Sequence, residues 1–317
     1  MRKECFAAMD LGTNSCRILV ANNNAEIVYR NSATVKLGEG LEEKGNLSEE
    51  AKERTLKCLF EYKQNMDKYN IVGVRAVATA AMRKAKDGED FLKEIFNEAR
   101  IKFEIIDADE EARLTLKGAK IHIKGKSKYA VVYDIGGGST EITLAENDDN
   151  AKTINTISMP FGSMNSTEKF SLENYNKEGF DKLYAEIKPY TDKFVKESNL
   201  EKYIDDVKAV ATSSSPLRLA ALIKGFASYD RFKADGIVMT KEQMDAKISE
   251  VYDMSLEERC SNPCIGRNRG PLFISTCIIF KTIYDALNVK EITASLKAAQ
   301  EAIIEELIQE WQIQHKK

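Results

Sequence analysis

The sequence predicts an α/β protein made of two domains that share one core topology. Three observations predict this: a glycine-bearing turn that occurs twice, three strands around and after each copy, and helices that alternate with strands in the rest of each half. Residues 10–18 and 134–142 both read Asp, an apolar residue, Gly, two others, Ser, two others and Ile. Each copy lies between two apolar runs, which predicts a β-hairpin. The repetition indicates a duplicated unit.

The first half begins with two hairpin strands, at about 5–9 and 18–21, and a third strand is expected at 33–37. Ser48 is a helix N-cap, with Glu49 and Glu50 in the first turn. Strands at 71–78 and 103–106 follow, and Asp109 opens a further helix. Two helices present apolar faces at helical spacing, the first through Leu56, Leu59, Phe60 and Met66, the second through Phe91, Ile95, Phe96 and Ala99.

The second half restarts the same order. Strands are expected at 129–133, 142–145 and 154–159, and later at 207–211 and 289–293. The polar, glycine-containing link at 124–128 divides the chain, so the expected domains are residues 1–123 and 124–299. A final amphipathic helix begins near Leu296, and the sequence leaves open whether residues 300–317 pack back on the first domain.

The composition of the chain narrows the classes of protein to which it can belong. The 317 residues suffice for two cores, and 43% apolar with 31% charged residues is ordinary for a globular protein. No apolar run approaches the ~20 residues of a membrane span, and no signal peptide is seen, so we expect a cytoplasmic protein without a membrane partner. A net charge of −3 gives no signal for nucleic acid. The sequence leaves homodimerisation open.

Nitrogen- or sulfur-based metal chemistry is poorly supported. The chain has two histidines, and its six cysteines are scattered, with no second ligand pair beside Cys260 and Cys264. Carboxylates are therefore the more plausible acid and base groups.

The two turns themselves predict phosphate binding. Three consecutive glycines at 136–138 cost conformational entropy, and they are justified where backbone N–H groups must approach an anion closely. Two such turns, one in each similar domain, suggest a ligand in a cleft between them. The expected phosphate donors are Asn14, Ser15, Gly136, Gly137, Gly138 and Ser139.

Five stretches, in order, resemble the exopolyphosphatase and guanosine pentaphosphate phosphatase (Ppx/GppA) family. They begin at Asp10 (Asp-Leu-Gly-Thr-Asn-Ser-Cys-Arg), Lys36 (Lys-Leu-Gly-Glu-Gly-Leu), Ala78 (Ala-Thr-Ala-Ala-Met-Arg), Asp109 (Asp-Glu-Glu-Ala-Arg-Leu) and Asp134 (Asp-Ile-Gly-Gly-Gly-Ser-Thr-Glu). The resemblance implies two RNase H-like domains of the actin, sugar-kinase and Hsp70 type facing a central cleft, in the family's short two-domain form.

The resemblance also implies roles for single residues. Glu111 corresponds to the family's catalytic glutamate, which orients or deprotonates the attacking water, and Glu141 is expected to assist across the same cleft. Asp10 and Asp134, each at a strand end, are placed to share a hydrated Mg²⁺. Arg17 and Arg83 are expected to neutralise phosphate charge, with Arg83 at the family's polyanion-contacting position.

The second half departs from the family pattern in three places. Thr212–Pro216 replaces a Gly-Gly-Thr turn, residues 298–302 replace Gly-Leu-Arg-Glu-Gly with Ala-Ala-Gln-Glu-Ala, and the segment 260–269 looks longer. Loss of glycine removes close backbone approach, and glutamine lacks the charge and fork of arginine.

Three functions are therefore weighed. The leading one is an Mg²⁺-dependent phosphohydrolase that releases terminal phosphate from inorganic polyphosphate or guanosine pentaphosphate. The alternative is a (p)ppGpp- or polyphosphate-binding regulatory protein with little or no turnover, suggested by the altered loops. An ATP-dependent kinase is disfavoured, because adenosine-binding Gly-Gly loops are not evident and the Glu-Glu-Ala-Arg stretch is present.

Overall fold

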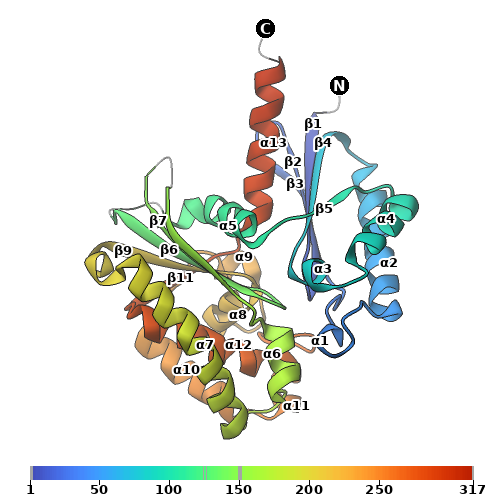
Figure 1. The fold of residues 1–317 in the computed structure, drawn as a ribbon. Helices are drawn as coiled ribbons and strands as arrows, with labels where there is room; N and C mark the ends of the chain where they lie inside the picture. Colours follow the sequence, from blue (N-terminus) through green and yellow to red (C-terminus); the bar gives the residue numbers. More distant parts are fainter. Residues whose placement is uncertain (1–2, 124, 126, 149–151, 316–317) are drawn as a thin grey trace. The chain divides into compact units, whose positions relative to one another are not determined.

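The computed structural model describes residues 3–123, 125, 127–148 and 152–315. They form two compact units (Figure 1): unit 1 is Met1–Gly118 with Ala299–Lys317, and unit 2 is Ala119–Ala298. The division falls inside the helix α5 (Ala108–Ile123), a few residues before the boundary drawn at 123/124 from the sequence.

Unit 1 is built on a five-stranded sheet with the order β3-β2-β1-β4-β5. The first three strands pair antiparallel as two successive hairpins, and β4 and β5 continue the sheet parallel to β1. The strands are β1 (Glu4–Leu11), β2 (Ser15–Asn22), β3 (Ile27–Thr34), β4 (Asn70–Ala78) and β5 (Phe103–Ile105).

Helices cover both faces of this sheet. On one face lie α2 and α4, whose Leu59 and Phe91 enter a buried cluster with the strands (Figure 1). On the other lies α13, whose Ile303 packs with Phe6 of β1. The helices of unit 1 are α1 (Leu41–Lys44), α2 (Glu49–Met66), α3 (Ala80–Lys84), α4 (Gly88–Ala99), the first part of α5, and α13 (Ala299–His315).

Unit 2 repeats this arrangement with a sixth strand. Its order is β10-β11-β9-β6-β7-β8: β6, β7 and β8 form the antiparallel meander, and β9 and β11 extend it in parallel. The strands are β6 (Tyr129–Ile135), β7 (Thr140–Glu146), β8 (Thr153–Met159), β9 (Val207–Thr212), β10 (Val238–Thr240) and β11 (Glu291–Ala294). The predicted α/β class and the shared core topology are confirmed.

The core of unit 2 lies between its sheet and the helices α7 and α12. Among the described residues, one segment, Gly270–Leu287, is long and apolar enough to cross a membrane, and 72% of it is buried in the structure. It therefore packs as a core helix. The helices are α6 (Ser163–Phe170), α7 (Lys177–Ser198), α8 (Ser214–Ile223), α9 (Arg231–Ala234), α10 (Lys241–Asp253), α11 (Leu256–Ser261) and α12 (Phe273–Leu287), with 3-10 turns at Leu200–Lys202, Ile204–Asp206 and Gly270–Leu272.

Several local predictions need correction. The third strand, predicted at 33–37, ends at Thr34, because the next amides leave the ladder to bond the first turn. Phe60 and Phe96, predicted to face inward, are 42% and 47% exposed. Both continue an apolar stripe of their helix, but they lie at the margin of the face that meets the sheet. The strand predicted at 289–293 is β11, and the last helix begins at Ala299 rather than at Leu296.

Candidate functional site

The turn in unit 1 joins β1 to β2. The amide of Gly12 donates to the carbonyl of Ser15 at 3.0 Å and closes the turn. Asp10 lies one residue before the end of β1 and faces Arg17 in the antiparallel register. The Nη1 atom of Arg17 lies 3.2 Å from Oδ2 of Asp10. The predicted metal ligand and the predicted phosphate cation of this turn are thus paired with each other.

The segment after β3 holds this turn from behind. The amides of Val35 and Lys36 donate to the carbonyl of Asn14 at 3.0 and 3.1 Å, and the amide of Gly38 donates to the carbonyl of Thr13 at 2.9 Å. Within the described parts of the chain, the amides of Thr13 and Asn14 have no hydrogen-bond acceptor. The turn therefore has its carbonyls fixed and two N–H groups available, which is the arrangement that binds anions.

The turn in unit 2 is built in the same way. The amide of Gly136 donates to the carbonyl of Ser139 at 3.0 Å. The start of α6 holds the turn from behind: the amide of Ser163 donates to Gly136, and that of Met164 to Gly137, at 2.9 and 2.8 Å. The amides of Gly137 and Gly138 have no acceptor among the residues that the structure describes. Of the predicted donors of this turn, Gly137 and Gly138 therefore have amides without an internal acceptor, as in an anion-binding nest, whereas the amide of Gly136 is used to close the turn.

Two further glycines explain how the backing segments come so close. A Cβ on Gly38 would lie 2.3 Å from Cγ2 of Thr13, and a Cβ on Gly162 would lie 2.4 Å from the backbone of Gly137. A side chain would therefore clash at both positions, with the methyl group of Thr13 at Gly38 and with the backbone of the turn itself at Gly162. Sequence reasoning noted Gly38 only as part of a motif and missed Gly162. The signal was available, because both glycines follow the third strand of their own half.

Glu141 lies directly opposite Asp134 in the β6–β7 register. It is 3% exposed, and Oγ of Ser158 donates to its Oε1 at 2.8 Å. In the first turn the matching position is held by Arg17. The second hairpin therefore presents two carboxylates where the first presents a carboxylate and a guanidinium.

Glu111 lies in the first turn of α5, which follows β5. Nη1 of Arg83 donates to Oε2 of Glu111 and to the carbonyl of Ile106, both at 2.8 Å. The strands β1, β4 and β5 run parallel, so their carboxyl ends meet at one edge of the sheet, where open α/β sheets bind ligands. Asp10, Arg83 and Glu111 all lie at this edge of unit 1.

The residues expected to hold Mg²⁺ suit that ion in chemistry. Asp10 and Asp134 offer carboxylate oxygens, and Mg²⁺ is commonly bound by one or two carboxylates while it keeps several waters. No group of three His, Cys, Asp or Glu side chains arranged to hold a metal occurs among the described residues. All six cysteines are free, so Cys260 and Cys264 form no disulfide.

The altered loop at 212–216 begins beside the second turn. Thr212 pairs with Asp134 in the parallel β6–β9 register, and α8 begins two residues later. Ser213 has φ +85° and ψ 178°, a conformation that glycine adopts and other residues rarely do. The hydroxyls of Thr212 and Ser213 have no hydrogen-bond partner in the described structure. The loop thus has a glycine-like backbone at a serine.

A second altered segment, 298–302, has a structural role at the start of α13. Gln300 is buried, and its Nε2 donates to the carbonyl of Ala8 at 3.1 Å. Its amide fixes the first turn of α13 on β1.

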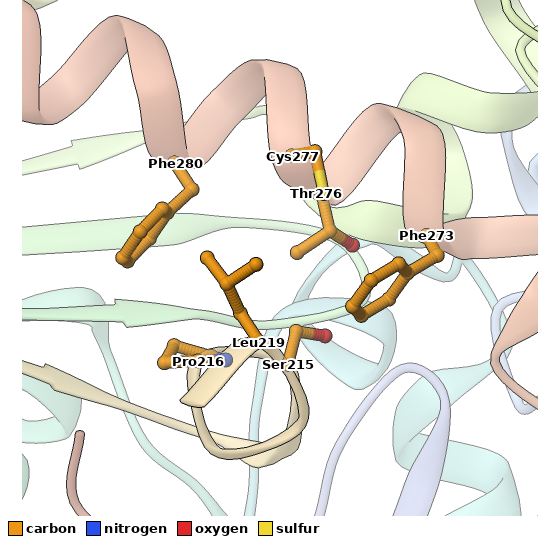
Figure 2. A pocket seen from close by; sticks show the side chains of 7 residues that line it. All are labelled: Ser215, Pro216, Leu219, Phe273, Thr276, Cys277 and Phe280. Atoms are coloured by element: carbon orange, nitrogen blue, oxygen red, sulfur yellow. The ribbon is translucent and has the colours of Figure 1, made fainter. Parts of the chain in front are cut away.

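A small cavity in unit 2 lies beside the altered loop, because Ser215 and Pro216 of that loop line it. Figure 2 shows side chains of α8 and α12 converging on it, with Leu219 between Phe273 and Phe280. Its lining residues are Ser215, Pro216, Leu219, Phe273, Thr276, Cys277 and Phe280, and none is a predicted site residue. Burial raises the pKa of the Cys277 thiol to about 12, which disfavours the thiolate form at neutral pH.

Comparison with known proteins agrees with the motifs. The profile of the Ppx/GppA phosphatase family matches residues 19–310. A bifunctional 3-dehydroquinate synthase/phosphatase of Fusobacterium nucleatum is 41% identical over 179 residues, which is 53% of this chain. The chain spans 26% of that protein's length.

Two solved structures are similar over nearly the whole chain. An exopolyphosphatase-like protein superposes with a TM-score of 0.89 at 24% identity, covering 97% of this chain and 99% of its own. The Aquifex aeolicus member of the Ppx/GppA family superposes with a TM-score of 0.76 at 25% identity, covering 99% of both chains.

Proposed function

The chain belongs to the Ppx/GppA phosphatase family, and on that premise we propose that it is a phosphohydrolase acting on phosphoanhydride bonds. The substrate class is a linear phosphate chain, either inorganic polyphosphate or guanosine pentaphosphate, from which the terminal phosphate is released. One observation carries the proposal: both turns fix their carbonyls from behind and leave successive amide N–H groups available.

Phosphoryl transfer to water requires mainly positioning and charge neutralisation. The turn amides of Thr13, Asn14, Gly137 and Gly138 bind phosphate oxygens in this proposal. The carboxylates of Asp10 and Asp134 would be the ligands of Mg²⁺, and the ion would supply positive charge to the phosphate oxygens. Glu111 accepts a proton from the attacking water.

Arg83 has two roles in this scheme. Its guanidinium holds Glu111 by a charge-assisted hydrogen bond at 2.8 Å, and it also bonds the carbonyl of Ile106. It therefore orients the proposed base and adds positive charge at the edge of the sheet. Arg17 neutralises Asp10 and is the second cation available to a phosphate group.

The test is phosphate release from long-chain polyphosphate and from guanosine pentaphosphate, with and without Mg²⁺. Glu111→Gln keeps the shape of the side chain and removes its basicity, so turnover should fall by about 10²–10⁴-fold. Asp109→Asn is the matched control, because it removes an exposed carboxylate from the same helical turn. Its turnover should stay within about twofold.

A second function is favoured by a specific observation, the strained loop at Ser213 that replaces the family's glycines. It is a binding protein for the same ligands with little turnover. If wild type releases no phosphate from either substrate, and Glu111→Gln changes only affinity, this second function is correct. If wild type is active and Glu111→Gln keeps the full rate, Glu111 is not the base, and Glu141 becomes the residue to test.

A further inference from the structure

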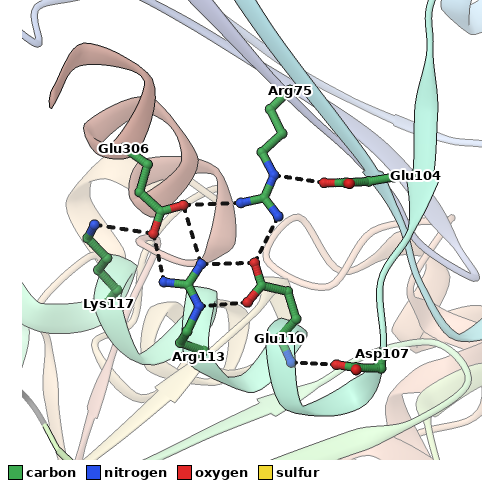
Figure 3. Close-up of polar contacts among 7 residues, drawn as sticks. All are labelled: Arg75, Glu104, Asp107, Glu110, Arg113, Lys117 and Glu306. Atoms are coloured by element: carbon green, nitrogen blue, oxygen red, sulfur yellow. Dashed lines mark hydrogen bonds and ion pairs between the residues drawn. The ribbon is translucent and has the colours of Figure 1, made fainter. Parts of the chain in front are cut away.

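A cluster of ion pairs in unit 1 joins four elements (Figure 3). Its centre is Arg75 of β4, which donates through Nε to Glu104 of β5 at 2.8 Å. Nη2 of Arg75 donates to Glu110 of α5 at 2.8 Å, and Nη1 donates to Glu306 of α13 at 3.1 Å. All three nitrogen positions of one guanidinium are therefore used, each on a different element.

Arg113 closes the cluster from the other side. Its Nε and Nη2 form a bidentate pair with Glu110 at 2.6 and 2.9 Å, and its Nη1 donates to Glu306 at 2.7 Å. Lys117 adds a third cation to Glu306 at 3.3 Å. Glu110 and Glu306 are each bridged by the same two arginines, so no pair in the cluster is isolated.

The cluster uses two residues of the Glu-Glu-Ala-Arg stretch, Glu110 and Arg113, and leaves Glu111 to Arg83. Successive residues on a helix differ in direction by about 100°, so the two glutamates point to different partners. The carboxylate of Asp107 accepts the amide of Glu110 at 2.8 Å and caps the turn. The turn that carries Glu111 is therefore held by Arg83, by the cap and by the arginines of the cluster.

The ionisation of Glu110 depends on the arginines around it. Hydrogen bonds from Arg113, with a further one from Arg75, lower the pKa of Glu110 to about 2, against burial, which raises it. The side chains of Arg75 and Glu110 are each 26% exposed and that of Glu306 is 19% exposed, so solvent screens them less than a surface pair. Isolated exposed pairs contribute little, but bidentate pairs joined in a network fix geometry.

We propose that Arg75 is a positioning residue for Glu111. It fixes the first turn of α5 by holding Glu110 against β4, β5 and α13, and so keeps the neighbouring glutamate directed toward Arg83. The proposal rests on the function proposed above for Glu111. It also gives α13 a role in that reaction, because Glu306 of this helix holds both arginines.

The experiment compares Arg75→Met with Arg30→Met. Arg30 of β3 forms an ion pair with Glu301, which also lies on α13 but outside the cluster. Both variants exchange a guanidinium for a thioether and remove one ion pair between the sheet and α13. Arg75→Met also removes the ion pairs with Glu104 and Glu110. A merely structural role of Arg75 therefore predicts a larger loss of thermal stability than in Arg30→Met and no specific change in turnover. A positioning role predicts a specific fall in kcat.

For Arg75→Met we expect kcat to fall about tenfold or more with KM within about twofold, because misplacement of a catalytic group by about 1 Å can cost up to about 10²-fold. For Arg30→Met we expect kcat within about twofold of wild type. Arg75→Lys should restore only part of the rate, since a lysine ammonium is a point charge and cannot form the three-way fork. Equal kcat in the two methionine variants, or a change confined to KM, would overturn the proposal.

Hydrogen exchange of residues 107–113 provides a readout that does not need activity. The amides of Glu110 and Glu111 bond to Asp107, and they should exchange about tenfold faster in Arg75→Met and at the wild-type rate in Arg30→Met. Unchanged exchange in Arg75→Met overturns the proposal even if wild type is inactive. An inactive wild type with faster exchange refutes the proposed hydrolysis and keeps Arg75 as the residue that orders this turn.

Discussion

The two glycine turns have the same backbone and different charge, because the first pairs an acid with a cation and the second pairs two acids. Both close with a glycine amide bonded to a serine carbonyl at 3.0 Å, and both are held from behind by the segment that follows the third strand. At one matched position, however, Arg17 faces Asp10 in unit 1 whereas Glu141 faces Asp134 in unit 2. The comparison teaches that duplication preserved the anion-binding backbone while the side chains diverged. The first turn holds a cation that is paired with its own acid, and the second presents a pair of acids that attracts a cation.

The two turns also differ in the atoms that a side chain would strike at the glycine behind each turn, Gly38 or Gly162. Gly38 meets the side chain of Thr13, whereas Gly162 meets the backbone of Gly137 and Gly138. A smaller residue in place of Thr13 would relieve the contact at Gly38, whereas no substitution can remove the backbone that Gly162 meets. The consecutive glycines of the second turn therefore serve two purposes, close packing behind and open amides in front.

The largest expected effect separates the acids of the two turns. Asp134→Asn should lower Mg²⁺-dependent phosphate release by about 10²-fold or more, the size of loss seen when one preorganised electrostatic contact is removed. Asp10→Asn should cost less, about tenfold, because it frees the guanidinium of Arg17 for phosphate. Initial rates measured against Mg²⁺ concentration check both. Equal losses of phosphate release in Asp134→Asn and Asp10→Asn would show that the two acids do not have these different roles.

The next effect tests the backing contacts. Gly162→Ala and Gly38→Ala should each destabilise the protein by about 1–3 kcal/mol, the usual cost of overpacking. Thr13→Ser removes the Cγ2 methyl that Gly38→Ala would strike, so this second change should recover most of the loss in the Gly38→Ala protein. No side chain is available to shrink beside Gly162. Urea unfolding of the single and double variants measures the difference, and failure of Thr13→Ser to rescue would contradict the assigned contact.

A smaller effect concerns pH. The pKa of Glu110 is about 2 in the folded protein, below the ordinary value of about 4.3 in an unfolded chain. A lowered folded pKa gives stability that is present above the unfolded pKa and is lost as pH falls toward the folded one. Between about pH 4.5 and pH 2, unfolding of wild type should therefore take up about one proton more than unfolding of Glu110→Gln. Denaturant titrations at several pH values measure this. If the stability of wild type and of Glu110→Gln depended on pH in the same way, the arginines would not lower the pKa of Glu110.

The smallest effect lies in the loop beside the second turn. Ser213→Gly should stabilise the protein by about 0.5–1 kcal/mol, because glycine adopts φ +85° without strain and the serine hydroxyl has no partner to lose. Ser214→Gly, one residue on and in the first turn of α8, is the control and should destabilise. A loss of stability in Ser213→Gly would mean that the hydroxyl makes an interaction that matters.

Much of the fold follows from sequence. The repeated Asp-Gly-Ser pattern predicts both hairpins, and the structure confirms them. Ser48 caps α2 as predicted, accepting from the amide of Ala51. Such features depend on residues close together in the chain, so local patterns encode them. The predictions for the end of the third strand and for the burial of Phe60 and Phe96 were wrong. The length of a strand and the face that a helix buries depend on partners distant in the chain.

By itself the sequence determined the α/β class, the duplicated turns and the family resemblance, because each is written in short patterns of residue type. Only the tertiary structure decided which charged side chains form ion pairs with one another. Arg17 could face phosphate or Asp10, and the β1–β2 register pairs it with Asp10. Glu306 meets Arg75 across 231 residues of chain, and the packing of α13 on the sheet brings them together. Ion pairing needs only proximity and opposite charge, so composition supplies many possible partners and the fold selects among them.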